Sequence, residues 1–334
     1  MIAQLSADYV LTRPMKALTR ILSYALYEGR PVTTRGRWIN PIVFTMLEAM
    51  RRLPQFGRVD CPVFVVGTGR SGTTILGVAL SMHRDVGFLN EPKAMWHAIQ
   101  PDEDVVGNYA EAPGRYCLDE SDAGSETIET ARKLFAAYLF VTRARRVVDK
   151  YPELIFRVPF VKAIFPDAKF VLLSRNGWDT ALSIEEWSRT HRNVVNEEVH
   201  DWWGVNRRKW RLVCSELVPR EPLLAAQADA ISSLVREADM GAVEWIVTMQ
   251  EGLNCVKRYP DDVKLVRFED LSADPASVLK DLFLFLDLPH DAVCVKFASR
   301  LLKPRAHHGR FSINSAVRDA FSRVMDGLGY DSAN

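Results

Sequence analysis

The chain lacks the features that mark membrane-spanning, secreted or nucleic-acid-binding proteins. Its 334 residues carry 43 Lys and Arg against 42 Asp and Glu, so the formal net charge is only +1 and no bulk field attracts nucleic acid. No apolar run reaches the ~18–20 residues of a membrane span. Residues 1–7 have neither the basic start nor the apolar core of a secretory signal. We therefore expect a cytoplasmic protein without a nucleic-acid partner. Any site that binds an anion must then depend on a few nearby residues rather than on the overall charge.

Cysteine is also scarce, with five residues that are odd in number and far apart in the sequence. They show neither the spacing of metal ligands nor a disulfide framework, so we expect reduced thiols and no bound metal. The remaining composition is 48% apolar and 25% charged, which is ordinary for a globular protein. The length suffices for one large core with a helical cap.

A glycine-rich loop that follows an apolar run is the most informative motif present. Residues 63–66 read Val-Phe-Val-Val, then Gly67 opens a loop that ends at Gly72, and an apolar stretch of helical length follows. Strand, tight loop and helix form a phosphate cradle. The position where a nucleoside triphosphatase has lysine is Thr73, and the positive charge stands earlier, at Arg70. The loop therefore predicts a phosphate site that does not hold ATP in the usual way, although a purely steric use of the glycines is the simpler interpretation.

The segment Arg70-Ser71-Gly72-Thr73-Thr74 resembles the 5′-phosphosulfate loop of sulfotransferases that use 3′-phosphoadenosine-5′-phosphosulfate (PAPS). About a hundred residues later, an apolar run at 169–174 ends in Arg175, and Ser183 follows eight residues on. An Arg at a strand end and a Ser at that spacing form the 3′-phosphate clamp of the same family. A guanidinium offers a planar fork to phosphate, and a serine hydroxyl adds a donor. Two motifs in the right order make the resemblance specific.

Further segments at 148–152, 165–169 and 264–271 also resemble the family, so that the likeness covers residues 63–330. It implies an α/β fold with a central parallel β-sheet flanked by helices on both faces, a P-loop-like nucleotide-binding core and a helical cap. It also implies one sulfotransferase domain over 61–334. Residues 1–60 lie outside the resemblance, and their apolar spacing predicts a helical extension that packs on the core. The alternation of apolar runs with helical stretches independently favours a parallel sheet, with ligands at the carboxyl ends of the strands. Within the cap we expect helices at 123–145, 199–217 and 237–257, and a loop at 102–124.

The resemblance implies in-line transfer of a sulfuryl group from PAPS to an acceptor hydroxyl, with 3′-phosphoadenosine-5′-phosphate (PAP) as product and no metal. Arg70, Thr73 and Thr74 would bind the 5′-phosphate, and Lys150 would reach the transferring group unless it is only a surface lysine. Phe88-x-x-Glu91-Pro92 followed by Trp96-His97 resembles carbohydrate sulfotransferases, which makes Glu91 the expected general base and favours a sugar or glycolipid acceptor. His97 remains the alternative base. A carboxylate is a weak base near neutral pH, so we expect the site to raise the pKa of Glu91.

A basic stretch at 303–310 is the counterpart of the family's last nucleotide-binding loop. It departs from the usual Arg-Lys-Gly pattern. The residues expected to contact the donor there are Arg305, Gly309 and Arg310.

The N-terminal region leaves two interpretations open. Leu11, Met15 and Leu18 recur at helical spacing, with Arg13, Lys16 and Arg20 off that stripe. The helices could simply pack on the core. Alternatively, they could form a basic amphipathic surface that touches a membrane or a lipid-linked acceptor.

Three other functions share part of the pattern. A nucleoside kinase or small ATPase should have Lys at position 73, and a Rossmann dehydrogenase should have an acidic residue ending a strand in a convincing βαβ unit, which Glu91 only approaches. A non-catalytic nucleotide-binding protein would bind PAP without turnover. Titration with PAP, ATP and NAD separates these possibilities.

Overall fold

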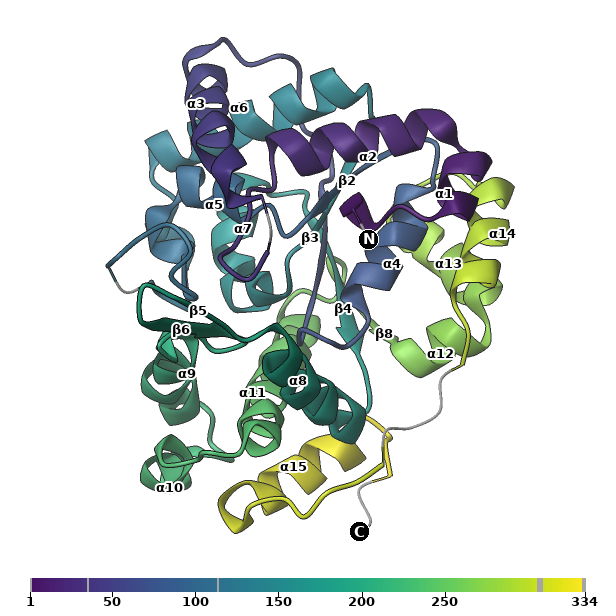
Figure 1. The fold of residues 1–334 in the computed structure, drawn as a ribbon. Coiled ribbons are helices and arrows are strands. Elements are labelled where there is room, and N and C mark those ends of the chain that lie inside the picture. Colours follow the sequence, from purple (N-terminus) through teal and green to yellow (C-terminus); the bar gives the residue numbers. More distant parts are fainter. Residues whose placement is uncertain (1, 35, 113, 305–308, 332–334) are drawn as a thin grey trace.

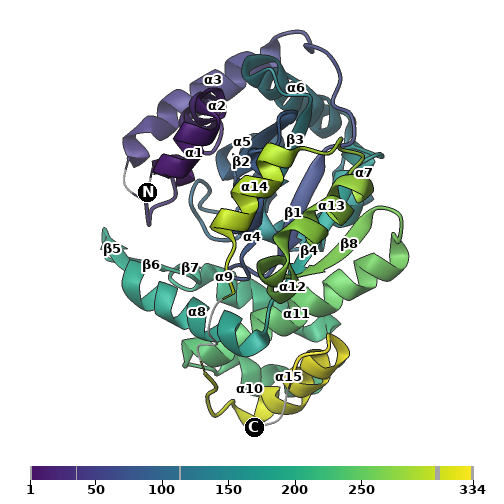
Figure 2. The same ribbon diagram turned by 90° about the vertical axis from the view of Figure 1, so that its right-hand side faces the viewer.

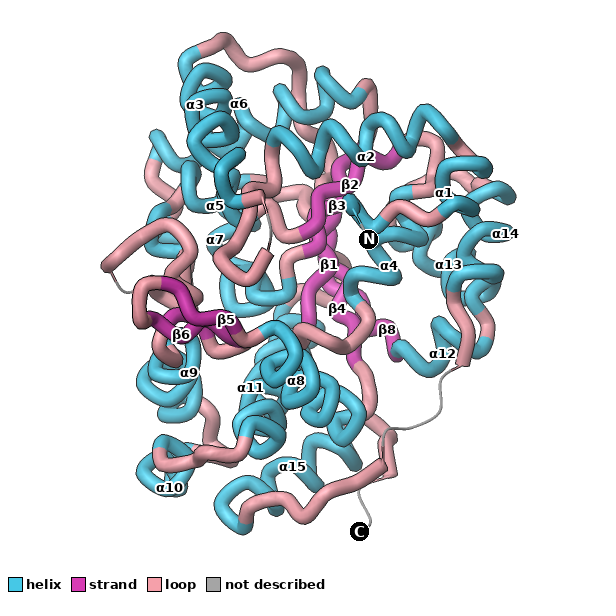
Figure 3. Tube along the Cα trace, viewed as in Figure 1, coloured by secondary structure: helices cyan, strands magenta, loops and turns pink. Residues whose placement is uncertain are grey.

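A five-stranded parallel sheet forms the centre of the molecule in this computed structural model, which describes residues 2–34, 36–112, 114–304 and 309–331. The strands lie in the order β2-β3-β1-β4-β8 and run through the middle of Figure 3. Their bounds are β1 Val63–Gly67, β2 Val86–Asn90, β3 Arg146–Lys150, β4 Lys169–Ser174 and β8 Val263–Arg267. Every residue of β1 is buried, as expected for a strand covered on both faces. The predicted α/β fold is confirmed.

Alternate side chains of β1 enter two hydrophobic cores. Phe64 and Val66 belong to the first core, and Val63 and Val65 to the second, because successive side chains of a strand point to opposite faces. Helices of the first core are α5 (Lys93–Ile99), α6 (Ser125–Thr142), α7 (Val158–Ile164), α8 (Gly177–His191), α11 (Glu237–Arg258) and α15 (Ser315–Gly327). Helices of the second core are α4 (Thr73–Ser81), α12 (Phe268–Ala273), α13 (Pro275–Phe285) and α14 (Ala292–Leu301). Figure 2 shows α12, α13 and α14 together over the sheet.

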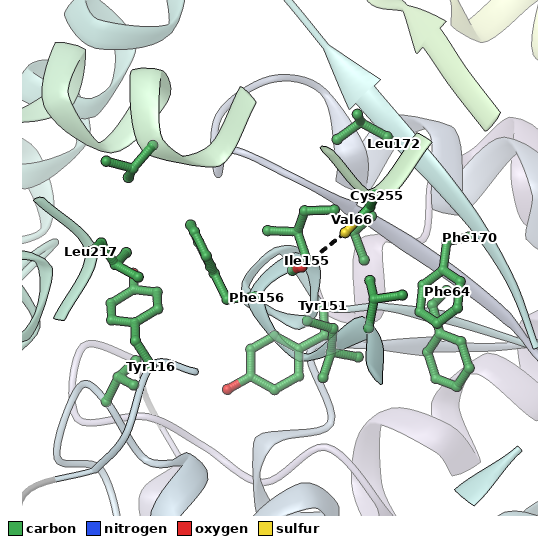
Figure 4. Close-up of a cluster of buried hydrophobic side chains, with 14 of the residues drawn as sticks. Phe64, Val66, Tyr116, Tyr151, Ile155, Phe156, Phe170, Leu172, Leu217 and Cys255 are labelled. Carbon is green, nitrogen blue, oxygen red and sulfur yellow. Dashed lines mark hydrogen bonds between the residues drawn. The ribbon is translucent and has the colours of Figure 1, made fainter. Parts of the chain in front are cut away.

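Aromatic rings fill the first core next to the sheet. Figure 4 shows Phe64 of β1 beside Phe170 of β4, with ring centroids 5.4 Å apart. In the same view the Cys255 thiol faces the Ile155 carbonyl at 3.9 Å, and burial raises the pKa of this thiol. No disulfide links the five cysteines, all of which lie in the described ranges. None of the described helices has the length and apolar character needed to cross a membrane.

Three N-terminal helices, α1 (Ala7–Thr12), α2 (Pro14–Leu26) and α3 (Asn40–Arg52), lie along the upper part of Figure 1. Tyr9 of α1 and Ala17 of α2 are buried in the second core, whereas Val43 and Leu47 of α3 are buried in the first. The segment before residue 62 therefore contributes side chains to both sides of the sheet.

The orientation of α1 and α2 differs from a simple amphipathic arrangement. Leu11, Met15 and Leu18 are 83%, 71% and 50% exposed. The basic residues face the protein instead, as three contacts show: Arg13 pairs with Asp291 at 2.8 Å, Lys16 donates to the Val86 carbonyl at 2.6 Å, and Arg20 pairs with Glu28 at 2.5 Å. The prediction of a basic outer surface on these helices was wrong, because their cations meet carboxylates and carbonyls of the core.

A small antiparallel sheet lies within the predicted cap. Its strands are β5 (Asn193–Val195), β6 (Glu198–Asp201) and β7 (Gly204–Val205), so the prediction of a helix over 199–217 was wrong in its first half. Gly204, Asn206 and Arg207 have positive φ of 77°, 47° and 61°, which a helix does not accommodate. The second half forms α9 (Arg208–Leu212) and a π-helix at Val213–Leu217, and α10 (Ala228–Ser232) follows. The predicted helices at 123–145 and 237–257 are present as α6 and α11, and 102–124 is mostly irregular.

Candidate active site beyond the carboxyl ends of the strands

The loop between β1 and α4 has the backbone shape of an anion-binding turn. Gly67, Arg70 and Gly72 have positive φ of 139°, 68° and 99°, and a Cβ at Gly72 would lie 2.5 Å from the Phe268 ring. Gly72 is the N-cap of α4 and supplies no side-chain hydrogen bond, so no side chain there satisfies the first N–H groups of the helix. A helix end of this kind stabilises a bound anion through its N–H groups and its dipole.

The side chains of this loop divide between the cavity and the interior. Arg70, Thr73 and Thr74 line a cavity of about 400 Å³. Ser71 is fully buried, and its hydroxyl donates to the Thr68 carbonyl at 2.6 Å. Ser71 is therefore placed to shape the loop, and any contact between it and the donor would come from its backbone.

The two motifs that are a hundred residues apart in the sequence meet in space. Arg70 Nε donates to Ser183 Oγ at 3.1 Å, and Arg175 Nη1 donates to the Arg70 carbonyl at 3.2 Å. Arg175 follows β4, Ser183 lies on α8, and both residues are buried. The Arg175 guanidinium also lies 3.7 Å from Asp179 and 5.2 Å from the centre of the Phe268 ring. The adjacent pairing of β1 and β4 brings the two predicted phosphate-binding elements together.

Glu91 and Lys150 meet because they stand at the ends of neighbouring strands. Asn90 of β2 is in register with Lys150 of β3, and the Glu91 N–H donates to the Lys150 carbonyl at 2.7 Å. Glu91 has a positive φ of 50°, and its carboxylate forms an ion pair with the Lys150 ammonium. The Lys150 side chain is 2% exposed, so its interpretation as a surface lysine was wrong.

Opposing effects act on the pKa of Glu91. Burial raises it, but Lys150 and then Lys93 outweigh burial and hold the pKa well below its usual range. Lys93 Nζ lies 3.8 Å from Glu91 and 3.7 Å from Glu153. The expectation that the site raises the pKa of Glu91 was wrong, because the carboxylate contacts the buried Lys150 ammonium and lies near the Lys93 ammonium. Glu91 is accordingly ionised at neutral pH, and its side chain remains 37% exposed beside the cavity.

His97, the alternative base, does not line the cavity that holds Glu91. It lies on α5 and lines a separate cavity of about 520 Å³ together with Phe44 and Tyr109. Its Nδ1 is buried and has no hydrogen-bond partner among the described residues, and burial lowers its pKa. His97 and Glu91 therefore line different cavities.

The basic C-terminal segment is described only in part, and Arg305 lies outside the described residues. Gly309 and Arg310 line a third cavity, of about 410 Å³, with Asn176 and Asp179 of the region that follows Arg175. Arg310 Nη2 pairs with Asp331 at 2.8 Å. The segment thus passes close to the proposed 3′-phosphate clamp, and the roles of its residues stay predictions.

A sequence model described as the sulfotransferase family matches residues 62–217. That stretch contains the glycine-rich loop, Glu91, Lys150, Arg175 and Ser183. Over this stretch, just under half of its length, the chain is similar to the sulfotransferase family.

Two protein-tyrosine sulfotransferases resemble the chain over a limited part of their length. Protein-tyrosine sulfotransferase 1 of Danio rerio is 28% identical over 122 residues, which are 35% of this chain and 34% of that protein. Protein-tyrosine sulfotransferase A of Caenorhabditis elegans is 26% identical over 145 residues, 42% of this chain and 37% of that protein. The chain thus spans about a third of the length of the curated relatives it matches. The sulfotransferase domain from the curacin biosynthetic pathway superposes with a TM-score of 0.48 at 16% identity, over 82% of this chain and 99% of that domain.

Several residues of this candidate site were not found from the sequence. Lys209 forms an ion pair with Glu244 at 2.6 Å, and Trp202 Nε1 donates to the same carboxylate at 2.7 Å. A Cβ at Gly69 would collide with the Trp202 ring, so this tryptophan closes over the loop. The N-terminal segment 28–34 also lines the cavity. None of these residues stands in a motif, and only the tertiary structure brings them to the site.

Proposed function

We propose that this protein transfers a sulfuryl group from PAPS to an acceptor hydroxyl, with a sugar or glycolipid as the favoured acceptor. The observation that carries the proposal is the direct contact of Arg70 with Ser183 and with Arg175. These three residues come from the two nucleotide-binding motifs, and together they offer two guanidinium groups and a hydroxyl to a doubly phosphorylated nucleotide.

On the donor side, the residues fit the two ends of PAPS. The uncapped N–H groups of α4, with Arg70, Thr73 and Thr74, would hold the 5′-phosphate and stabilise charge that develops on its bridging oxygen. Arg175 and Ser183 would hold the 3′-phosphate, and Gly309 and Arg310, with Arg305 beyond the described residues, would cover it. When bound, PAPS supplies the activated sulfuryl group. Among the described residues no group of His, Cys, Asp and Glu is arranged to hold a metal ion, and the proposal assigns no role to one.

On the acceptor side, Glu91 would accept the proton of the attacking hydroxyl. Its low pKa makes it a weak base toward a free hydroxyl, but the hydroxyl becomes acidic as its oxygen bonds to sulfur, so a weak base suffices late in the transfer. Lys150, which contacts Glu91, would stabilise the negative charge of the transferring group. An anion next to Lys150 would also weaken its hold on Glu91, which raises the basicity of the carboxylate.

The cavity lining supports a polar acceptor. Its aliphatic side chains are few, namely Pro31, Val32, Val106 and Pro152, and the others are mostly polar, charged or aromatic. This composition suits a saccharide better than an apolar acceptor. The likeness to protein-tyrosine sulfotransferases favours a second candidate acceptor, the phenolic hydroxyl of tyrosine. Thr73 at the lysine position of the loop continues to disfavour a kinase.

The test of the donor assignment is the preference for PAP over AMP. PAP is expected to bind far more tightly, and Arg175→Ala should reduce that preference by ~10-fold or more, because a hydrogen bond between two charged groups is lost. Isothermal titration calorimetry with PAP and with AMP measures the two affinities and hence the preference. Arg189→Ala, at an exposed arginine of α8, the helix that carries Ser183, is the control. Ser183→Ala is a gentler variant that should lower the preference without removing a buried charge. Equal affinity of the wild type for PAP and AMP would sink the assignment.

We also propose that the protein acts in the cytoplasm and contacts a membrane surface through Leu11, Met15 and Leu18. Leu11 lies near the end of α1, and Met15 and Leu18 lie in the first half of α2. Exposed apolar side chains of this kind bind the boundary between headgroups and acyl chains.

Vesicle sedimentation tests the contact. Wild type should bind phosphatidylcholine vesicles, and replacing all three residues by serine should weaken binding by ~10-fold or more. Because Arg13, Lys16 and Arg20 face the protein, added phosphatidylserine should change binding little. Leu284→Ser, at an exposed leucine of α13, is the control. A wild type that stays in solution, or a triple variant that binds equally well, would contradict the contact.

A further inference from the structure

The N-terminal segment 28–34 forms a wall of the cavity that holds Glu91. All seven of its residues line the cavity. The segment follows α2 and lies outside the residues that match the sulfotransferase family. It is therefore a contribution of this chain's own N-terminal region to the proposed acceptor side.

Side-chain contacts fix this segment to the end of β2. The Glu28 carboxylate accepts hydrogen bonds from Arg20, at 2.5 and 2.9 Å, and from the Asn90 N–H at 2.8 Å. Gly29 has a positive φ of 67°, and a Cβ there would lie 2.6 Å from the Ala94 side chain. Asn90 immediately precedes Glu91, so the anchor of the segment is one residue from the proposed base.

Arg30 is held in place within this wall. Its N–H donates to Asn40 Oδ1 at 2.7 Å, and Asn40 Nδ2 donates back to its carbonyl at 2.9 Å. Its guanidinium lies 3.4 Å from the centre of the Tyr24 ring, which also lines the cavity. A pre-positioned guanidinium loses little conformational entropy when it binds an anion.

The Arg30 guanidinium is buried without a carboxylate. Arg30 is 5% exposed, and its hydrogen bond at Nη1 goes to the neighbouring Gly29 carbonyl at 2.6 Å. No ion pair among the described residues, at N···O distances up to 4.0 Å, includes Arg30. The undescribed positions contain neither Asp nor Glu. Buried arginines elsewhere in the chain do have acids, as Arg20 has Glu28 and Arg157 has Glu103.

The ammonium groups of the same cavity contrast with Arg30. Lys150 pairs with Glu91, Lys93 lies between Glu91 and Glu153, and Lys209 pairs with Glu244. A buried charge without an opposite charge is costly, and a ligand that supplies the opposite charge removes that cost.

We infer that Arg30 binds an oxyanion carried by the acceptor, so that the substrate is an anionic saccharide bearing a uronate carboxylate or an ester sulfate near the accepting hydroxyl. The planar fork of a guanidinium matches the oxygens of either group. This inference rests on the proposed function, because it places the accepting hydroxyl at Glu91, but the anion site can be measured without turnover.

The test compares three ligands that differ at one carbon, namely phenyl β-D-glucoside, phenyl β-D-glucuronide and the 6-sulfate of the glucoside. Saturation-transfer NMR measures their binding to the full chain, with and without saturating PAP. Wild type is expected to bind at least one anionic ligand ~10-fold or more tightly than the glucoside. Whichever of the glucuronide and the 6-sulfate binds more tightly identifies the oxyanion. Arg30→Gln should abolish the difference, and Arg30→Lys should restore part of it. Arg58→Gln removes an exposed arginine and should leave the preference intact.

Each outcome decides one of the two proposals. Equal binding of the three ligands by wild type, or an anion preference that survives in Arg30→Gln, would overturn the inference even if PAP binds well. Absence of PAP binding would overturn the proposed function, while the ligand preference measured without PAP would still report on Arg30. Thermal unfolding of each variant shows whether it is folded. If Arg30→Gln does not fold, Arg30→Lys takes its place in the comparison. Once an acceptor is in hand, Arg30→Gln should raise its KM and leave kcat nearly unchanged, since Arg30 binds a group remote from the reacting oxygen.

Discussion

Glu91→Gln is expected to lower turnover by ~100-fold or more, the usual scale for loss of a general base. The amide keeps the size of the side chain but cannot accept the proton of the acceptor hydroxyl. The affinity for PAP should stay within a few-fold of wild type, because Glu91 follows β2, whereas Arg70 and Arg175 belong to the loops after β1 and β4 and Ser183 to α8. Single-turnover transfer from PAPS, together with calorimetry of PAP, measures both quantities.

The matched comparison is His97→Asn. His97 lines a different cavity, so its variant should retain turnover within a few-fold of wild type. Glu91→Asp keeps the charge near Lys150 and should lose less activity than Glu91→Gln. Normal turnover by Glu91→Gln, combined with an inactive His97→Asn, would transfer the assignment to His97 and remove the main support for a sugar acceptor.

The parts of the site that follow from local sequence were predicted well. The glycines at 67 and 72, the apolar run before them and the helix after them specify a strand, a turn and a helix end through short-range sterics. Because parallel strands align their carboxyl ends on one edge, the motif at 67–74 and the motif at 175–183 were expected at the same edge of the sheet, and the pairing of β1 with β4 places them side by side. Their contact through Arg70 is the result.

The pairing of Glu91 with Lys150 could not be predicted in the same way. It depends on β2 lying next to β3 and on the register of Asn90 with Lys150. Neither strand order nor register is encoded within one motif. The prediction for the pKa of Glu91 was wrong for the same reason, since burial of the carboxylate was expected but the two nearby ammonium groups of Lys150 and Lys93 were not.

The N-terminal helices show a further limit of periodicity. The spacing of Leu11, Met15 and Leu18 shows that these residues share a face, but it does not say which face the protein covers. The core contacts Tyr9 and Ala17 instead. Likewise, the prediction of a helix from residue 199 ignored Gly204 and Asn206, two residue types that tolerate positive φ: Gly204 begins β7 and Asn206 follows it.

Lys150→Met is expected to lower turnover by ~10²–10³-fold, because one preorganised positive charge next to the transferring group is lost. Methionine keeps the length and apolar packing of this buried side chain. The substitution also acts on Glu91. In the wild type burial raises the pKa of Glu91, and Lys150 and Lys93 together lower it by more. Without Lys150 the effect of burial is less opposed, so the pKa of Glu91 must rise.

The sign of the pH effect follows from that rise. Glu91 accepts a proton only when ionised, so the residual activity of Lys150→Met should fall on the acid side at a higher pH than the activity of wild type does. Profiles of kcat against pH measure the shift. Lys93→Met is the control, since Lys93 lies farther from Glu91, at 3.8 Å, and it should move the acid limb less. An acid limb that stays in place in Lys150→Met would mean that the titrating base is not the carboxylate that Lys150 contacts, and Glu91 would lose its role even if turnover fell as expected.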